Sequence, residues 1–412
     1  MATIAAYMSP SVGHLYPFVG VLLELQRRGH RIHFRTLRRE LPRMRALGFE
    51  VDAIDPRLER VELDDWQSRP LGEELIAIVE TFARRAEFGA PDLRSLLERA
   101  QPDLVIIDIN AWGAAAAAEA SGLPWVSLAP YAPFVRSEGL PPPGPGLLPA
   151  RSPIARARQA ALDRLVLDPA ERVLVQRRNE VRARLAGLPP LDSGAAHARR
   201  APVTLVTTAE PLEYPRPDWA PDLRLVGDPS WEPPLAPPGW LDELPDPIVL
   251  VTTSSEFQRD DAIVRTALEA FEGEPVSVVA TMPAGVPPGI RVPANARLEQ
   301  FVPHSAVLDR AVCVVSHGGL GVTQKALMRG VPVVAVPWGR DQFEVAAKLE
   351  HARAGVRVPR RALTPRRLRD AVAQARGLRE GVEAVAAGLA AAGGAPLAAS
   401  LIEDQLAARL AG

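Results

Sequence analysis

The 412-residue sequence has a single cysteine and almost no lysine. Cys313 by itself excludes a disulfide within the chain and any metal site built from several thiolates. Lysine appears only at Lys325 and Lys348, so the 48 basic residues are nearly all arginine, and 49 acidic residues balance them. A net charge of −1 spread along the chain gives no basic surface for nucleic acid or anionic lipid. We therefore expect no nucleic-acid partner.

Long hydrophobic runs are also missing, and no window reaches the roughly 20 apolar residues that a membrane span needs. The N-terminal stretch MATIAAYMSP has no basic region and no long apolar segment, so we expect a cytoplasmic protein without a membrane span. The chain is too long for one ordinary core and suits two domains of about 200 residues each. We expect a monomer or a homodimer.

Short apolar runs alternate with helical patterns in both halves of the chain, which predicts βαβ units and parallel sheets. In the first half, the expected strands are 3–8, 31–36, 50–54, 103–108, 124–129 and 203–208, and the expected helices are 14–28, 39–47, 72–86, 111–121 and 154–187. In the second half, the expected strands are 248–254, 276–281, 296–302, 312–316 and 331–337, with helices at 260–272, from residue 304, before residue 330, at 341–353 and within 364–411. Two doubly wound α/β domains follow from this order.

Two proline-rich stretches interrupt the alternation. EGLPPPGPGLLPARSPI, at 137–153, predicts a long loop, which either carries function or simply links two elements. GDPSWEPPLAPPGWLDELPDP is typical of an interdomain linker. The expected division is a first domain over 1–226, the linker over 227–247, a second domain over 248–390, and a C-terminal helix over 391–412 that packs across a domain surface.

The segment VVSHGGLGVTQKALMRGVPVVAVP, at 314–337, places glycines between a strand and a helix. Glycines let the backbone approach a ligand closely, and the helix start suits a phosphate group. A merely tight turn explains the glycines equally well, and His317 could be an ordinary strand-end histidine. The sequence has no GxxxxGK[ST] loop, no third glycine with a following acidic residue, and no GxSxG elbow, which argues against P-loop, nicotinamide and serine hydrolase sites.

Together with RDQFEVAAKLE, at 340–350, this segment resembles the donor-binding signature of the family 1 glycosyltransferases, which have the GT-B fold. The resemblance is strong over 301–358, includes PSVGHLYP at 10–17, and is carried elsewhere by the order of elements. Much of it is to bacterial natural-product glycosyltransferases of the macrolide type. It implies two facing Rossmann-like domains with a cleft between them. It also implies transfer of a sugar from a uridine or thymidine diphosphate sugar to a small-molecule acceptor.

The resemblance implies roles for residues of the second domain. The residues expected to contact the donor diphosphate are His317, Gly318, Gly319, Gly321, Thr323, Ser254 and Ser255. The family more often has a glycine in the loop TTSSEF at 252–257, which weakens the assignment of the two serines. Asp341 and Gln342 would hold sugar hydroxyls, although Asp341 could otherwise be a helix N-cap. Arg297 and Val302 would contact the nucleobase, Val302 through its backbone.

In the first domain, His14 follows the first expected strand and a Ser-Pro turn, at the start of a helix. Such a side chain projects into the crevice at the carboxyl ends of the strands, and the positive helix end should lower its proton affinity. From position alone, His14 could be a surface histidine and Asp108 a helix N-cap. The resemblance implies instead that His14 is the general base and that Asp108 fixes its tautomer, so that transfer inverts the anomeric carbon.

An apolar or aromatic acceptor is a further hypothesis, although large apolar residues are more often core. The residues that could line its site are Trp66, Phe82, Phe88, Asn110, Trp112, Tyr131 and Phe134. No cofactor and no metal ion are expected, because no His, Asp and Cys ligand set is visible and family members generally need no ion. Two alternatives remain open: a GT-B-type sugar-nucleotide epimerase, and a non-catalytic sugar-nucleotide binding or auxiliary protein. His14 with Asp108, and the long proline-rich loop, argue for an acceptor site.

Overall fold

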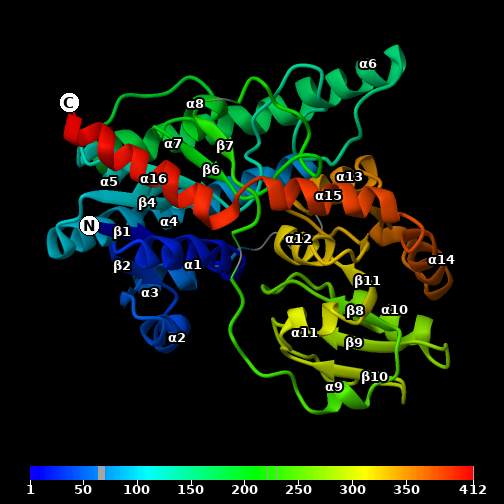
Figure 1. The fold of residues 1–412 in the computed structure, drawn as a ribbon. Helices are drawn as coiled ribbons and strands as arrows, with labels where there is room; N and C mark the ends of the chain where they lie inside the picture. The colour runs from blue at the N-terminus through cyan, green and yellow to red at the C-terminus, as the bar shows by residue number, and fades with distance from the viewer. Residues whose placement is uncertain (64–69, 220, 230, 412) are drawn as a thin grey trace.

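The computed structural model describes residues 1–63, 70–219, 221–229 and 231–411, with only the backbone described for 409–411. Within these ranges the chain forms two parallel sheets, each packed between helices, as the sequence predicts (Figure 1). The first sheet lies in the blue to green part of the chain and the second in the green to orange part. A long C-terminal helical segment lies along both.

The first sheet has seven strands in the described residues, in the order β3-β2-β1-β4-β5-β6-β7. These strands are β1 Thr3–Tyr7, β2 Arg31–Thr36, β3 Glu50–Ala53, β4 Leu104–Asp108, β5 Trp125–Ala129, β6 Thr204–Val206 and β7 Leu223–Leu225. The helices of this part are α1 Val12–Arg27, α2 Leu41–Ala46, α3 Pro56–Arg60, α4 Leu71–Ala100, α5 Trp112–Ala120, α6 Pro153–Leu162, α7 Asp168–Ala186 and α8 Gly194–Ala198. The central strands β1, β4 and β5 are buried almost throughout, which explains their continuous apolar sequences.

The second sheet has six described strands in the order β10-β9-β8-β11-β12-β13. They are β8 Ile248–Thr252, β9 Ser277–Thr281, β10 Ala296–Glu299, β11 Ala311–Ser316, β12 Val333–Ala335 and β13 Gly355–Arg357. The helices are α9 Trp240–Glu243, α10 Asp261–Phe271, α11 His304–Leu308, α12 Leu320–Leu327, α13 Gln342–His351, α14 Pro365–Ala375, α15 Arg379–Ala391 and α16 Gly394–Ala411. Cys313 is buried in β11, as its apolar neighbours indicate.

The strand order reverses at one point in each sheet, and this positions the candidate site. In the first sheet the reversal lies between β1 and β4, which are hydrogen-bonded neighbours. In the second it lies between β8 and β11, where Ser316 pairs with Thr252. Loops that leave neighbouring strands in opposite directions open a crevice at such a point, where doubly wound folds bind ligands.

The helices differ from the expected ranges in two places. The expected helix at 72–86 continues through Gly89 and Pro91 and ends at Ala100, because α4 packs along α5 and α7 over its whole length. Gly113 makes this contact possible, since a Cβ there would meet the carbonyl of Ala86. The single helix expected at 154–187 is divided by a π turn at Asp163–Leu167 into α6 and α7.

The C-terminal helices cross from one sheet region to the other. After α14, helix α15 packs on α12, and α16 then packs on α1, where Ala398, Ala399 and Ile402 join the first core (Figure 1). The expectation that no segment has membrane-like composition was wrong, because Arg379–Ala408 is long and apolar enough, with a mean hydropathy of 1.7 in its best window. Of the residues in that window, 28% are buried inside the protein.

Candidate active site

The point where the strand order of the first sheet reverses, between β1 and β4, brings His14 and Asp108 together. We call this point, and its counterpart between β8 and β11 in the second sheet, a switch point. Asp108 is the last residue of β4, and His14 lies in the first turn of α1, after the turn that ends β1. His14 Nδ1 donates to Asp108 Oδ2 at 2.7 Å. Because Nδ1 is engaged by the carboxylate, Nε2 is the ring nitrogen turned away from Asp108. The Asp108 side chain is fully buried, whereas 15% of the His14 side chain is exposed.

The Asp108 carboxylate is held by four hydrogen bonds. Oδ2 also accepts from the Ser9 hydroxyl at 2.8 Å and from the Ser9 amide at 3.1 Å, while Oδ1 accepts from the Asn110 amide at 2.8 Å. Burial alone would raise the pKa of Asp108, but the His14 charge and these donors lower it below its usual value. Asp108 is therefore an ionised partner that fixes both the tautomer and the orientation of the His14 ring.

The pKa of His14 departs from the sequence-based expectation. Burial is the largest single influence and lowers this pKa, but the charge and hydrogen bond of Asp108 raise it, and the net result is a raised pKa. Glu256 and Asp341, both from the second sheet region, add to the rise. The helix end was expected to lower the proton affinity, and this was wrong because three carboxylates outweigh it. Glu256 and Asp341 therefore lie within electrostatic reach of His14.

The glycine-rich loop follows β11 at the second switch point and contains Gly318, Gly319 and Gly321. Two of these positions require glycine, each for a different reason. Gly318 has φ +87°, in the left-handed region that favours glycine. Gly319 is the N-cap of α12, and a Cβ there would lie 2.5 Å from Nε2 of His317. Gly321 faces open space and meets no such limit. The loop therefore presses the His317 ring against backbone at the start of a helix, which is a good site for phosphate oxygens.

His317 and Thr323 carry buried polar atoms without a partner among the described residues. Burial, followed by the Arg340 charge, lowers the pKa of His317 to about 4, so the ring is neutral. Its Nδ1 and the hydroxyl of Thr323 are buried and make no hydrogen bond in the part of the chain that the structure describes. A neutral imidazole can still donate one hydrogen bond to a phosphate oxygen.

The loop after β8 is organised by its own side chains. The amide of Ser254 donates to Asp260 at 2.7 Å, and the Ser254 hydroxyl accepts from the amide of Glu256 at 3.2 Å. Ser255 beside it is partly exposed. Glu256 is thereby aimed at Arg340, and Arg340 Nη1 lies 2.8 Å from its carboxylate. Arg340 itself has φ +59°, an uncommon conformation for a residue with a side chain.

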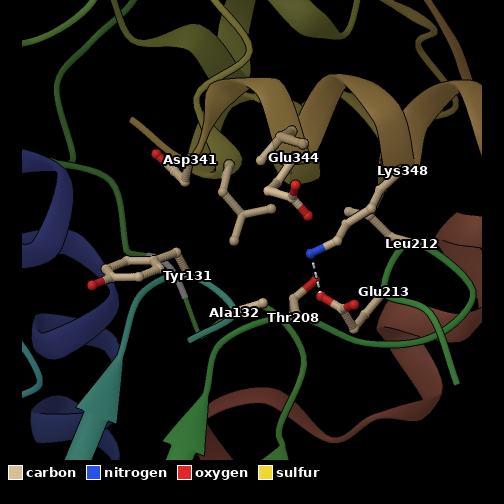
Figure 2. A pocket seen from close by; sticks show the side chains of 10 residues that line it. Tyr131, Ala132, Thr208, Leu212, Glu213, Asp341, Glu344 and Lys348 are labelled. Carbon is tan, nitrogen blue, oxygen red and sulfur yellow. Dashed lines mark hydrogen bonds and ion pairs between the residues drawn. The ribbon is translucent and has the colours of Figure 1, made fainter. Parts of the chain in front are cut away.

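A cavity of about 20 Å³ lies between the two sheet regions (Figure 2). Tyr131 and Asp341 lie at one end of it, and the other end is closed by Lys348, whose Nζ is 2.6 Å from the carboxylate of Glu213. Figure 2 shows Glu344 and Lys348 pointing from α13 into this space. Burial raises the pKa of Asp341, which is the N-cap residue of α13 but makes no side-chain capping bond. Its carboxylate thus lines the cavity without capping its own helix.

The other residues expected to contact the donor are Gln342, Arg297 and Val302. Gln342 is buried, its side-chain oxygen accepts from the amides of Trp338 and Gly339, and its nitrogen donates to Gln258 at 2.7 Å. Its side-chain oxygen thus accepts two hydrogen bonds, and one N–H of its nitrogen remains for a ligand. Arg297 lies on β10 and is partly exposed, and Val302 is buried in the following loop. No contact in the described residues joins these two to the glycine-rich loop.

Of the aromatic residues expected to line an acceptor site, Tyr131 lies nearest to His14. Their ring centroids are 5.9 Å apart, the Tyr131 hydroxyl donates to Asn110 Oδ1 at 2.7 Å, and the exposed Phe134 contacts Tyr131. Trp112 packs with Phe82 in a small core cluster between α4, α5 and α7.

The remaining two aromatic residues of that set are Phe88 and Trp66. Phe88 packs against the core under the guanidinium of Arg57, at 4.5 Å. Trp66 lies outside the described residues.

Sequence reasoning missed three residues of this site: Ser9, Glu256 and Arg340. Ser9 directly follows the first strand, so its position at a strand end was a usable signal. The Glu256–Arg340 pair had no such signal, because 84 residues separate its members and both lie in loops. Among the described residues, no group of three His, Cys, Asp or Glu side chains is arranged to hold a metal ion.

Comparison with known proteins gives relatives along the whole chain. Residues 265–402 match the family described as Erythromycin biosynthesis protein CIII-like, C-terminal domain. The sequence is 31% identical over 388 residues to 4'-demethylrebeccamycin synthase of Lentzea aerocolonigenes, covering 90% of this chain and 91% of the relative.

Solved structures agree with this comparison. The glycosyltransferase of kitacinnamycin superposes with a TM-score of 0.74 and 25% identity, covering 98% of this chain and 99% of the other. SsfS6 of Streptomyces sp. SF2575, solved in complex with thymidine diphosphate, superposes with a TM-score of 0.68 and 19% identity, covering 98% and 100% of the two chains. The fold is shared over nearly the full length.

Proposed function

The chain belongs to the natural-product glycosyltransferases with the GT-B fold, and we propose that it inverts the anomeric carbon of a thymidine diphosphate sugar while transferring that sugar to a small acceptor. The observation that carries this proposal is the 2.7 Å contact of His14 with Asp108, within electrostatic reach of Asp341 from the other sheet region. Such an arrangement serves a general base beside a donor sugar. The epimerase and the non-catalytic binding protein have no support among the relatives described above.

The proposed reaction begins with the acceptor hydroxyl. Nε2 of His14 takes its proton, and the acceptor oxygen forms a bond to the anomeric carbon from the face opposite the diphosphate. The bond between that carbon and the diphosphate oxygen breaks, and its electron pair leaves with the diphosphate. Asp108 stabilises the imidazolium that results, because its buried carboxylate stays ionised.

The donor side of the proposal uses the second switch point. The amides of Gly319 and Gly321, with a hydrogen bond from His317, meet the negative charge that develops on the diphosphate. The amide of Gly318, which was expected to join them, instead donates to the Ser316 hydroxyl at 3.1 Å. Thr323, Ser254 and Ser255 lie around this loop as weaker candidates, Asp341 and Gln342 would contact the sugar, and Arg297 and Val302 the base. We propose thymidine rather than uridine as the nucleoside of the donor, because SsfS6, which has a similar fold, was solved with thymidine diphosphate. No metal ion or other cofactor is assigned a step.

The acceptor side lies beside Tyr131 and Phe134. The Tyr131 ring is close to His14, and Phe134, which packs on Tyr131, is 43% exposed, so an apolar or aromatic acceptor could stack there. The proposal is therefore a sugar transfer to a small, largely apolar or aromatic natural product.

A transfer assay tests this function. Thymidine and uridine diphosphate glucose are incubated with a panel of phenolic and polyketide acceptors, and products are identified by mass spectrometry with and without EDTA. We expect a glycosylated product with the thymidine donor, unaffected by EDTA, and its loss in His14→Ala. His351→Ala, at the exposed end of α13, is the matched control and should keep the activity. Undiminished transfer to a hydroxyl by His14→Ala would contradict the assigned base.

A further inference from the structure

A second cavity, of about 50 Å³, lies within the first sheet region and is lined by residues other than those of the interdomain cavity. It lies between α5, α7, α8 and β5. Its walls include Ile109 and Trp112, which closely follow Asp108 in sequence, together with Arg178 from α7 and His197 from α8. The cavity therefore borders the turn that carries the catalytic carboxylate.

Three side-chain nitrogens on the walls of this cavity are buried and lack a hydrogen-bond partner among the described residues. They are Nε1 of Trp112, Nε of Arg178 and Nε2 of His197. The indole and guanidinium nitrogens can only donate, and the imidazole nitrogen donates in one neutral tautomer. A buried donor without an acceptor is costly, and most proteins satisfy nearly all of them. Three around one cavity point to a shared acceptor group.

The charges around the cavity favour an anion as the hydrogen-bond acceptor for these three nitrogens. Arg182 and Arg200 both pair with Glu119, the only acidic residue on the walls. Arg178 has no carboxylate partner in the described residues, and its one hydrogen bond there is a long one, 3.4 Å, to the carbonyl of Ile109. Its guanidinium also stacks on Trp112 at 4.5 Å.

The protonation states of Arg178 and His197 agree with an excess of positive charge around this cavity. Burial lowers the pKa of Arg178 to about 10, which still leaves it charged at neutral pH. Burial, followed by the charges of Arg178 and Arg182, lowers the pKa of His197 to about 3, so His197 is neutral. Three guanidinium groups thus face one carboxylate, and a bound oxyanion would offset this imbalance.

The cavity is linked to the active site through a short path of contacts. Arg178 lies within electrostatic reach of Tyr131, whose ring is 5.9 Å from that of His14. Tyr131 in turn donates to Asn110, the neighbour of Ile109 in the cavity wall. The cavity wall and the active site therefore share the turn at 108–112.

We propose that this cavity binds an acidic oxygen group of the acceptor, a carboxylate or an equally acidic oxygen, through Arg178, Trp112 and His197. The proposal rests on the proposed function and narrows its acceptor class to aromatic molecules with an oxyanion remote from the attacked hydroxyl. It also accounts for the position of Trp112, whose ring stacks on the guanidinium of Arg178 and whose buried N–H has no partner among the described residues.

Direct binding without any sugar donor provides the test. The probes are hydroxyaryl carboxylates of increasing length, each paired with its methyl ester, and binding is measured by isothermal titration calorimetry. The wild-type protein should bind the best acid about ten- to hundredfold more tightly than its ester, the range for a charged hydrogen bond. Arg178→Gln should abolish this preference, and Trp112→Phe, which keeps an aromatic ring but removes the N–H, should reduce it.

Arg177→Gln is the matched control, because Arg177 is the neighbouring arginine of α7 but pairs with Glu80 and Glu180 outside the cavity. It should keep the full preference. Equal binding of acid and ester by the wild-type protein, or a preference that survives in Arg178→Gln, would overturn the proposal. Sulfate that binds equally well, without any preference for acid over ester, would show a site for free anions only and would overturn the assignment to the acceptor.

Failure of this inference is distinguishable from failure of the proposed function. Binding preference is measured without a donor, so an intact preference in a protein that transfers no sugar would contradict only the function. Sugar transfer to acids and esters with the same KM, together with no binding preference, would contradict only the anion site.

Discussion

His14 belongs to a hydrogen-bonded network that also contains Asp108, Ser9 and Asn110. Asp108 is buried, fully ionised and held by Ser9 and Asn110, so it can only accept hydrogen bonds. The imidazole is therefore oriented before any acceptor binds. At this scale, the proposed chemistry depends on a raised pKa at His14 and a lowered one at Asp108.

The pH dependence of transfer follows from the direction of these pKa changes. A raised pKa keeps His14 protonated, and inactive as a base, to a higher pH than an ordinary histidine. The acidic limb of kcat/KM should therefore have an apparent pKa above about 6.5. In Asp108→Asn the main cause of the rise is removed, so this limb should move to lower pH while kcat falls by about 10² to 10⁴. A limb that stays in place in Asp108→Asn would contradict the pairing.

Sequence alone could predict part of this residue network. His14 and Asp108 each follow a strand, and the ends of parallel strands gather at one edge of a sheet, so their meeting was foreseeable. The influence of Glu256 and Asp341 on His14 was not, because it depends on how two separately folded sheets face each other. The expected sign of the His14 pKa change was wrong mainly because of Asp108, and Glu256 and Asp341 add to the rise.

At the scale of elements, the glycine-rich loop offers a comparison between neighbouring positions. In Gly319→Ala the new methyl group would meet the His317 ring, so the ring or the loop must shift. We expect donor affinity to fall about tenfold or more and stability to fall by about 1 to 3 kcal/mol. Thymidine diphosphate titration and urea unfolding measure both quantities. Gly321→Ala, in the same loop but facing open space, should leave stability within about 0.5 kcal/mol.

The proline-rich stretch at 137–153 is held to the second sheet region. Amides of Gly144 and Gly146 donate to the buried Glu344 at 3.0 and 2.8 Å, and Arg357 donates to the carbonyl of Gly146 at 2.6 Å. Of the two roles left open for this stretch, the contacts favour a functional one, because Glu344 lines the interdomain cavity (Figure 2).

A substitution in this stretch tests the contact. In Gly146→Ala the methyl group would meet the backbone of Phe343, and φ of +64° disfavours a side chain as well. We expect a loss of about 1 to 3 kcal/mol, measured as a lower midpoint in urea unfolding. Gly139→Ala is the control, since Gly139 also has positive φ, +77°, but has open space around it. Equal losses in the two variants would show that only backbone strain is felt and that the contact with α13 contributes nothing.

The sequence predicted long buried elements well and short or interrupted ones poorly. The central strands are continuous apolar runs, which mark a parallel sheet covered on both faces. By contrast β7 and β13 have three residues each, too few for a recognisable pattern. Gly89 and Pro91 read as helix ends, yet tertiary packing on α5 and α7 carries α4 past both.

At the scale of the whole molecule, α16 ties the end of the chain to its beginning. Ile402 is buried in the first core, and Glu403 pairs with Arg28 and His30 beside it. Ile402→Ala should destabilise the protein by about 2 to 5 kcal/mol, measured by urea unfolding, since it leaves a cavity in a packed core. The exposed Asp404→Ala, on the same helix, should change stability by less than about 0.5 kcal/mol. Similar values for the two variants would mean that α16 is not docked on α1.

The two sheet regions divide the work, one presenting an imidazole and the other a loop for a diphosphate. A crystal structure with thymidine diphosphate is the most direct measurement of this division. We predict that the diphosphate accepts a hydrogen bond from the amide of Gly319 and lies beside His317, with the cleft-facing Nε2 of His14 across from it. A diphosphate bound elsewhere on the protein would contradict the account.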